Sequence, residues 1–387
     1  MNEISFDRRV MIVTGEASGD LHGANLIRAF RRQAQDTEFF GVGGKEMAAT
    51  GCEIILPIEQ LSIMGIVEVI SHLPRIFGIF KKLKAILYGP RKPDALVLID
   101  SPEFNLRLAK EAARANVRVL YYVSPQVWAW RRGRVTKIAA VVDKLAAILP
   151  FEPELYKGLD IDVRYVGHPL LDEFGARDNS AALPACLQKK PGSIIVGLFP
   201  GSRRNELKYM LQTLSTAAGL IAAQKPDIHF LVPVATTLKH ENVADGFAAD
   251  LPVTFLSVEQ AGIYDIAASC DAIITVSGTV TLQIALVGTP MAIIYKLAPL
   301  SYAIGKRLVH VDFISLVNIV AGKHVVREFV QNEATPENLA AEILRILDDS
   351  DYASAISDEL AAVRKNLGEP GCSDRVAAML LEMLEQQ

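Results

Sequence analysis

The chain has 387 residues and 50% of them are hydrophobic, which is enough to build two or three domains of roughly 150 residues each. Its formal net charge of -4 argues against broad nucleic-acid binding. The 4 cysteines are far apart and form no CxxC pair, which argues against a metal or disulfide framework and fits a reducing cytoplasm. The sequence contains no apolar run of about 18 residues, so no transmembrane helix is predicted.

Short β-branched runs alternate with helical patterns in the first half of the chain. The pattern predicts strands at 9–14, 95–99, 117–123 and 144–149, and helices at 21–32 and 103–114. Such alternation is typical of parallel sheets covered by helices.

The polar, poorly periodic stretch 172–192 interrupts this rhythm and predicts a domain boundary. Beyond it, strands are predicted at 194–199, 229–234, 272–276 and 291–295, and helices near 336–347, 351–366 and 373–385. The predicted fold class is α/β, with two Rossmann-like doubly wound domains facing a central cleft, the arrangement called GT-B. We expect domains at 1–170 and 193–345, a linker at 171–192, and C-terminal helices at 346–387 that pack back on an N-terminal domain of the same or a partner subunit.

A glycine-containing turn, TGEASGDLHG, follows the first strand at 14–23. Glycines permit a tight turn, and the start of the next helix attracts an anion. The candidate contact residues are Glu16, Ser18, Gly19 and Asp20. The alternative is an ordinary turn in which Ser18 or Asp20 caps the helix.

Asp100 follows the apolar strand 95–99, where a general base would lie. Partial desolvation at such a position raises a carboxyl pKa. The alternative is that Asp100 only caps the following helix, and Pro102 at its first turn favours that interpretation.

The segment 121–134, YYVSPQVWAWRRGR, holds both tryptophans of the chain and three arginines. Aromatic surface beside guanidinium groups suits a sugar phosphate, so Trp128, Arg131 and Arg132 are candidate acceptor contacts. The alternative is a core tryptophan pair next to a solvated basic turn.

Two small-residue turns open helices in the second half. Gly201, Ser202 and Arg203 follow the strand 194–199, and the turn 277–279, SGT, follows the strand 272–276. Backbone amides at a helix start suit a diphosphate, and Arg203 would oppose the charge of a leaving group. Two such turns in one half favour a nucleotide pocket.

The segment 70–87 is amphipathic, with Phe77 and Phe80 on an apolar side and Lys81, Lys82 and Lys84 toward another. This pattern is compatible with a helix on a membrane surface and with a helix packed on its own sheet. Both interpretations stay open from the sequence.

Taken together, these strings resemble the lipid-A-disaccharide synthase family. The matching pieces, in the order of the family, are VTGEASGDLHG (13–23), MGIVEV (64–69), IDSPEFN (99–105), YYVSPQVWAWRRGR (121–134), LPFEPELY (149–156), VGHPL (166–170), FPGSRRNE (199–206), SGTVTLQ (277–283) and FISLVNIVAGK (313–323).

The resemblance implies an inverting hexosyltransferase that needs no metal or other cofactor. It implies transfer of 2,3-diacylglucosamine from UDP-2,3-diacylglucosamine to 2,3-diacylglucosamine 1-phosphate (lipid X), giving a β-1,6-linked disaccharide 1-phosphate and UDP. It further implies a cytoplasmic protein, peripheral on the inner face of the cytoplasmic membrane, that can form homodimers.

The resemblance also implies roles for single residues. Asp100 matches the essential aspartate and candidate base, Arg203 an essential arginine beside the UDP phosphates, and Asn318 an asparagine important for activity. Ser277, Gly278 and Thr279 match the diphosphate-binding loop.

Two positions depart from the family pattern. Gln283 stands where the family usually has a glutamate that holds the ribose hydroxyls, and an amide can still accept a hydrogen bond there but lacks charge. Val317 stands where a proline is usual. The competing interpretations are an enzyme like UDP-GlcNAc 2-epimerase, and an inactive nucleotide-binding relative, which only Gln283 favours.

Overall fold

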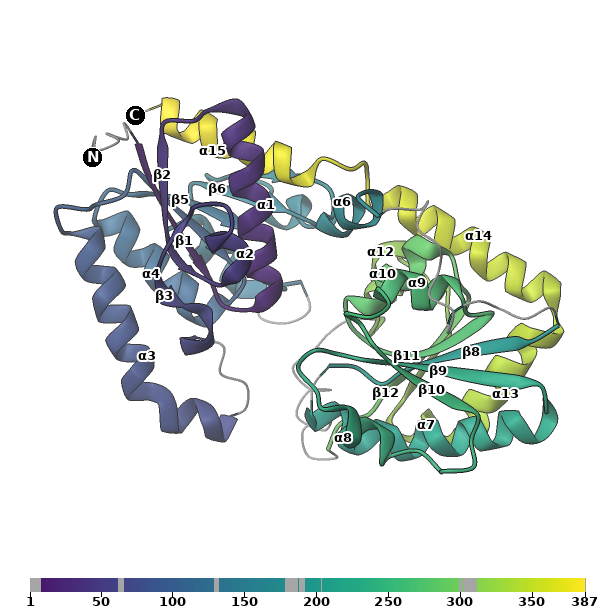
Figure 1. Cartoon of the computed structure of the whole chain (residues 1–387). Coiled ribbons are helices and arrows are strands. Elements are labelled where there is room, and N and C mark those ends of the chain that lie inside the picture. The colour runs from purple at the N-terminus through teal and green to yellow at the C-terminus, as the bar shows by residue number, and fades with distance from the viewer. Residues whose placement is uncertain are drawn as a thin grey trace. The chain divides into compact units, whose positions relative to one another are not determined.

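The computed structural model describes residues 8–61, 66–128, 132–177, 187, 192–202, 204–298, 302 and 312–386. The chain divides into two compact units (Figure 1). The first unit comprises Met1–Asp172 with Glu369–Gln387, and the second comprises Glu173–Gly368.

The first unit is built on a parallel sheet. Its strands are β1 (Arg8–Thr14), β2 (Thr37–Gly43), β3 (Glu53–Pro57), β4 (Ala95–Ile99), β5 (Arg118–Tyr122), β6 (Lys144–Ala147) and β7 (Asp162–Tyr165). Their order in space is β3-β2-β1-β4-β5-β6-β7. The order therefore reverses between β1 and β4, the point at which sheets of this kind bind ligands at the carboxyl ends of their strands.

Helices cover both faces of this sheet. They are α1 (Ala17–Gln33), α2 (Lys45–Ala48), α3 (Ile66–Leu87), α4 (Pro102–Arg114), α5 (Val135–Ala139) and α15 (Cys372–Glu385). Successive strand residues point to opposite faces. Ile12 and Val97 pack with α1 and α15, whereas Met11 and Leu98 pack with α3, α4 and α5. Because both faces are buried, the central strands are continuous apolar runs, which the sequence shows.

The second unit repeats the plan. Its strands are β8 (Ile194–Phe199), β9 (Ile228–Val234), β10 (Val253–Ser257), β11 (Ala272–Val276), β12 (Met291–Tyr295) and β13 (Glu328–Val330). They form one parallel sheet in the order β10-β9-β8-β11-β12-β13, which reverses between β8 and β11.

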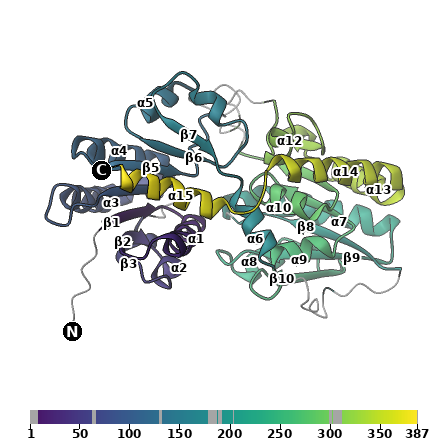
Figure 2. The same ribbon diagram turned by 90° about the horizontal axis from the view of Figure 1, so that it is seen from above.

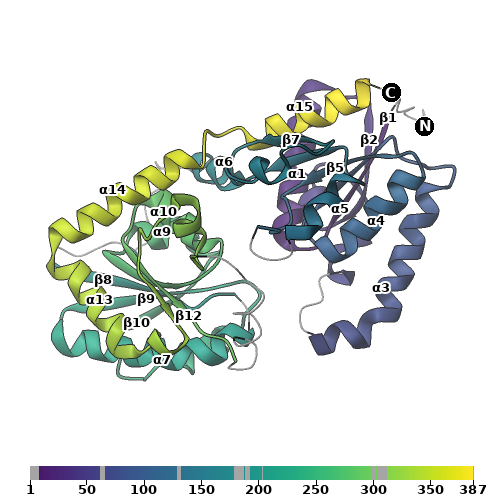
Figure 3. The ribbon, with the colours of Figure 1, turned by 180° about the vertical axis from the view of Figure 1, so that it is seen from behind.

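The helices of the second unit form two groups. They are α7 (Arg204–Gln224), α8 (His240–Ala244), α9 (Ile263–Ala268), α10 (Val280–Val287), α12 (Leu316–Ala321), α13 (Pro336–Asp348) and α14 (Ser350–Asn366). Helices α7 and α13 pack side by side, and α14 packs on α10 and α12 (Figure 3). Helix α6 (Pro169–Gly175) spans the boundary between the units. Short 3-10 turns lie at Ile58–Gln60, Arg132–Arg134, Pro153–Tyr156 and Gln331–Glu333.

The C-terminal helices differ from the prediction. Residues 346–387 were expected to pack together on an N-terminal domain, but α14 belongs to the second unit and only α15 returns to the first. The apolar face of α14, with Ile356, Leu360 and Val363, is buried in the second unit. Helix α15 lies along α1 and completes the first core (Figure 2).

Eight strands correspond to the predicted ones, with limits that agree within about two residues. The strands that the sequence did not identify, β2, β3, β7, β10 and β13, lie toward the outside of the two sheets. Several of them are only partly buried, so their apolar pattern is weaker. Among the described helices, none is long and apolar enough to cross a membrane.

Candidate active site

Each sheet brings two of the sequence-predicted turns together at its point of reversal. In the first unit the turn after β1 adjoins the turn after β4, because Thr14 pairs with Ile99. In the second unit the turns after β8 and β11 adjoin in the same way, because Thr275 pairs with Phe199. The candidate residues of each half therefore lie where the topology favours a ligand.

Asp100 stands in a strained turn between β4 and α4. Asp100 and Ser101 both have left-handed backbones, with φ of 56° and 42°. Two side chains fix the backbone of this turn. The side-chain amide of Asn105 donates to the Asp100 carbonyl at 2.8 Å, and the Tyr121 hydroxyl donates to the same oxygen at 2.6 Å. Non-glycine residues persist in this conformation only where the surroundings enforce it, and such residues gather at functional sites.

Asp100 is half-buried, and its Oδ2 atom is fully buried without a hydrogen-bond partner among the described residues. Burial raises its pKa from 3.8 to about 7, and the negative charge of Glu16 contributes further. The N-cap of α4 is Ser101, without a side-chain capping bond. The alternative interpretation of Asp100 as a helix cap is therefore wrong, and the carboxyl group is available for chemistry near neutral pH.

Two glycines of the first turn make room for this acid. A Cβ atom added to Gly19 would lie 3.0 Å from the Asp100 Oδ2 atom. A Cβ atom on Gly15 would lie 1.5 Å from the Ser101 Oγ atom. The glycine spacing of the motif thus allows the two turns to approach each other closely.

The remaining residues of that turn have different surroundings. Glu16 and Ser18 are exposed at the start of α1, whose N-cap is Glu16 without a side-chain capping bond. Asp20 is buried and accepts backbone amide hydrogens from Gly44, Glu46 and Met47 at 2.7, 3.0 and 3.2 Å. Neither Ser18 nor Asp20 caps α1, so that alternative is wrong. The Asp20 carboxylate instead binds the backbone amides at the start of α2, which gives it a structural role.

Trp128 is 9% exposed and packs edge-on against Phe151, with ring centroids 5.6 Å apart. Its Nε1 atom is buried without a hydrogen-bond partner among the described residues. This buried donor therefore has no acceptor in the described part of the chain, and Trp128 stays a predicted acceptor contact. Arg131 and the side chain of Arg132, the other candidates of this segment, lie outside the described residues.

In the second unit the two small-residue turns open helices α7 and α10. Gly201 has a left-handed φ of 97°, and the exposed Ser202 offers its carbonyl to the Thr237 hydroxyl at 2.8 Å. Arg203 lies outside the described residues. In the other turn, Thr279 is the N-cap of α10 and follows Ser277 and Gly278.

Asn318 does not present its side chain to a ligand. It is fully buried, its Oδ1 atom accepts from the Val325 and Val326 amides at 2.8 and 3.1 Å, and its Nδ2 atom donates to Val326 and Glu328 at 2.9 and 2.8 Å. Its prediction as a UDP-sugar contact therefore needs correction. The side chain acts within the protein, because all of its hydrogen-bonding atoms are used there.

Gln283 is half-buried on α10, and its backbone amide donates to the Thr279 carbonyl at 3.2 Å, so the two residues are one turn apart. Its side chain adjoins the phenol of Tyr264, whose buried hydroxyl has no hydrogen-bond partner among the described residues. The departure from the family pattern thus lies one helical turn from the SGT turn.

Helix α3 combines a buried and an exposed apolar side. Leu83 and Leu87 are fully buried in the core, and Phe80 is half-buried against Phe104, with ring centroids 5.9 Å apart. Phe77 is 61% exposed. Lys81, Lys82, Lys84 and Arg75 are exposed on the same helix. The packed-helix interpretation therefore holds for the C-terminal half, while Phe77 remains on the surface.

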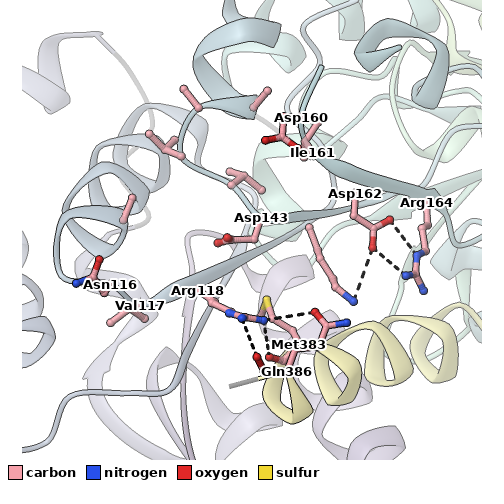
Figure 4. Close-up of a pocket in the computed structure, with 16 residues that line it drawn as sticks. Asn116, Val117, Arg118, Asp143, Asp160, Ile161, Asp162, Arg164, Met383 and Gln386 are labelled. Atoms are coloured by element: carbon pink, nitrogen blue, oxygen red, sulfur yellow. Dashed lines mark hydrogen bonds and ion pairs between the residues drawn. The ribbon is translucent and has the colours of Figure 1, made fainter. Parts of the chain in front are cut away.

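A hollow of about 680 Å³ lies at the amino ends of β5, β6 and β7, and Figure 4 shows the residues that line it. The turn that holds Asp100 follows the opposite, carboxyl end of β4. The three cations that line the hollow have partners in the chain: Arg118 donates to the Met383 carbonyl, Lys144 pairs with Glu382 at 2.8 Å, and Arg164 pairs with Asp162 at 2.8 Å. An anionic substrate would therefore compete with these partners. Within the described ranges, His, Cys, Asp and Glu form no cluster of three suited to a metal ion.

Sequence reasoning missed the residues that hold the candidate groups. Asn105 and Tyr121 fall inside quoted motifs, and an asparagine five residues after the acid was a usable signal. Glu328, which binds the Asn318 side chain, is 51 residues from Ser277 and lies in an outer strand. No local sequence pattern identifies it as part of the site.

The fold is shared with solved sugar-nucleotide enzymes. The structure of UDP-GlcNAc 2-epimerase from Neisseria meningitidis bound to UDP-GlcNAc is similar, with a TM-score of 0.65 and 12% identity over 98% of this chain and 100% of that one. The glycotransferase of kitacinnamycin has a TM-score of 0.62 and 16% identity over 98% and 99%. The two parallel α/β units thus define a protein of the GT-B class.

The model of the lipid-A-disaccharide synthetase family matches residues 10–380. The lipid-A-disaccharide synthase of Syntrophotalea carbinolica is 56% identical over 387 residues, which cover 100% of this chain and 98% of that protein. The synthases of Trichlorobacter lovleyi and Geobacter metallireducens are 48% and 47% identical, over 98% of each chain. The chain belongs to this family and is a glycosyltransferase.

Proposed function

We propose that this enzyme transfers 2,3-diacylglucosamine from UDP-2,3-diacylglucosamine to lipid X, forming a β-1,6-linked disaccharide 1-phosphate and UDP. The observation that carries the mechanism is the Asp100 carboxyl group, whose Oδ2 atom is buried without a hydrogen-bond partner among the described residues and whose pKa is raised to about 7. Such a group is ionised in part at neutral pH and is basic enough to accept a proton from a sugar hydroxyl as that hydroxyl attacks.

The chemistry is a single displacement. The acceptor 6-hydroxyl oxygen forms a bond to the anomeric carbon of the donor, and its proton passes to Asp100. The bond between that carbon and the diphosphate breaks, and its electron pair leaves with UDP. One displacement inverts the configuration at the anomeric carbon, so an α-linked donor gives a β-linked product.

The leaving diphosphate is assigned to the second unit. The turns at 201–203 and 277–279 open helices α7 and α10, whose amide groups and dipoles favour negative charge. Arg203 would add a fixed cation to the developing charge. Gln283, one turn into α10, is the candidate contact for the ribose.

The acceptor is assigned to the first unit. Glu16, Ser18 and Trp128 lie on the turns after β1 and β5, and the Nε1 atom of Trp128 offers an unused donor. For the acyl chains, the exposed Phe77 and its neighbouring lysines on α3 suit an interface of apolar chains and anionic headgroups. We therefore place the enzyme peripherally at the inner face of the cytoplasmic membrane.

The test is release of UDP by the purified enzyme from UDP-2,3-diacylglucosamine with and without lipid X. We expect release only when lipid X is present, and one disaccharide formed for each UDP. Conversion of the sugar nucleotide without an acceptor would instead support an epimerase. Identity of 39–56% to synthases across nearly the whole chain favours the transferase, since structural likeness at 12–16% identity speaks for the fold alone.

A further inference from the structure

Glu328, at the start of β13, collects hydrogen-bond donors from one segment of the second unit. Its Oε2 atom accepts the Ile314 amide at 2.9 Å. Its Oε1 atom accepts the Ser315 amide at 2.9 Å, the Asn318 side-chain amide at 2.8 Å and the Ser315 hydroxyl. Three of these donors converge on Oε1 and one binds Oε2, so both carboxylate oxygens are engaged within the protein.

The gathered segment is tied directly to the turn that we assign to the donor diphosphate. The Ser277 hydroxyl donates to the Ile314 carbonyl at 2.8 Å, across 37 positions of sequence. Glu328 holds the amide of Ile314, and Ser277 binds its carbonyl. The Glu328 carboxylate and the SGT turn therefore bind the amide and the carbonyl of the same residue, Ile314.

Asn318 extends the same scaffold in the other direction. Its side chain binds the backbone of Val325 and Val326, just before β13, and also binds Glu328 itself. Asn318 and Ser315 are both fully buried. Chain segments 314–318 and 325–328 are thus joined by one closed polar network.

We propose that Glu328 is a positioning residue of the donor site: it holds the 314–318 segment so that the Ile314 carbonyl orients the Ser277 hydroxyl and the turn that follows. This inference rests on the proposed donor site. Glu328 does not bind the diphosphate itself, because a carboxylate would repel it and both of its oxygens already accept hydrogen bonds from the 314–318 segment. It acts through the backbone that it fixes.

The substitution Glu328→Gln tests this because it keeps the shape and changes the donor count. One Oε atom becomes an NH2 group, which is itself a hydrogen-bond donor and cannot accept from the donors around it. At least one buried amide or hydroxyl therefore loses its acceptor. The segment is then less firmly held and the Ser277 hydroxyl loses its fixed acceptor. We expect the Kd for UDP to rise at least about tenfold, which corresponds to about 1.4 kcal/mol.

Glu342→Gln is the matched control. Glu342 is another acid of the second unit, fully buried on α13, and its partners are Arg327 at 3.0 Å and Tyr352 at 2.6 Å rather than residues of the donor turns. It should lower the unfolding temperature while leaving the Kd for UDP unchanged. The milder Ser315→Ala, which removes one of the four donors, should weaken UDP binding about threefold even if Glu328→Gln folds poorly.

The measurements are UDP titration calorimetry, donor KM and kcat, and hydrogen exchange of the 312–318 amides. The inference holds if Glu328→Gln and Ser315→Ala raise Kd and donor KM, speed exchange at 312–318, and change kcat less than KM. It is overturned if Glu328→Gln binds UDP as the unsubstituted enzyme does, or if Glu342→Gln weakens binding equally. Failure of the unsubstituted enzyme to bind UDP at all would refute the donor site itself.

Discussion

The substitution Asp100→Asn should make the protein more stable at neutral pH and nearly inactive. The pKa of Asp100 is raised from 3.8 to about 7, a change of about three pH units, and each unit corresponds to 1.36 kcal/mol. Keeping the ionised form in the fold therefore costs about 4 kcal/mol at most. An asparagine removes the charge, although its buried amide also needs a partner, so the net gain should be smaller, about 1–3 kcal/mol.

The sign of the effect depends on pH. Well below pH 3.8 the carboxyl group is protonated in both the folded and the unfolded chain, and the charge plays no part. Between about pH 4 and pH 7 the unfolded chain ionises first, so the folded state loses stability as the pH rises. The advantage of Asp100→Asn should accordingly grow across this interval and reach its maximum above pH 7.

Tryptophan fluorescence during denaturant unfolding measures the unfolding free energy of the first unit, because both tryptophans belong to that unit, as does Asp100. We expect a larger difference in unfolding free energy at pH 8 than at pH 5, together with a loss of turnover of at least about 100-fold. The kcat/KM of the unsubstituted enzyme should fall as the pH drops below about 7. Equal stability differences at both pH values, or near-normal turnover, would refute our account of Asp100.

Asp20→Asn is the control for the stability arm. Asp20 is a buried carboxylate in the adjoining turn, but it accepts three backbone amide hydrogens. Replacing one of its oxygens with an NH2 group should destabilise the first unit by about 1–3 kcal/mol. The same change from aspartate to asparagine should thus change stability in opposite directions at Asp20 and at Asp100.

Three further predictions concern the glycine turn, helix α3 and the ribose contact. Gly15→Ala places a Cβ atom 1.5 Å from the Ser101 Oγ atom, so thermal unfolding should show a loss of about 1–3 kcal/mol and turnover should fall with it; an unaltered enzyme would mean that the turns need not touch. Phe77→Ser should reduce vesicle binding with little change in stability, because Phe77 is exposed. Phe80→Ser should instead destabilise the protein, because it loses the packing on Phe104. Unchanged vesicle binding in Phe77→Ser would argue against the membrane role. Gln283→Glu should tighten UDP binding several-fold, by about 1 kcal/mol, because a carboxylate accepts a stronger hydrogen bond than an amide. The Tyr264 hydroxyl adjoins residue 283 and can donate to the new carboxylate. Equal affinities by calorimetry would exclude residue 283 from the nucleotide site, and weaker binding would show that the new charge is unpaired.

Local pattern was sufficient for the central part of each sheet. The strands β1, β4, β8 and β11 are buried on both faces, so the sequence records them as continuous apolar runs. The turns that follow them carry glycines, hydroxyl groups and an acid, and the ordered motifs identify the family. Position after a central strand also suffices to select Asp100, because a parallel sheet directs its carboxyl ends to one edge.

The chemical state of those residues was decided by segments far away in the sequence. Asp100 is a candidate base because Tyr121 and Asn105 hold its carbonyl and because Gly19 lets α1 close over its carboxyl group. Asp20, one turn along, is a cap because residues 44–47 bring their amides to it. Both are acids that follow a central strand in the sequence, and the hydrogen-bond partners that each finds in the folded chain distinguish them.

The same holds for the second unit and for the end of the chain. Asn318 can be selected as important from its motif, but only the folded chain shows that its amide faces Val326 and Glu328 rather than a ligand. The helices α14 and α15 are both amphipathic, yet they belong to different units. Periodicity specifies that a helix has an apolar face; which core that face completes depends on the tertiary packing available to it.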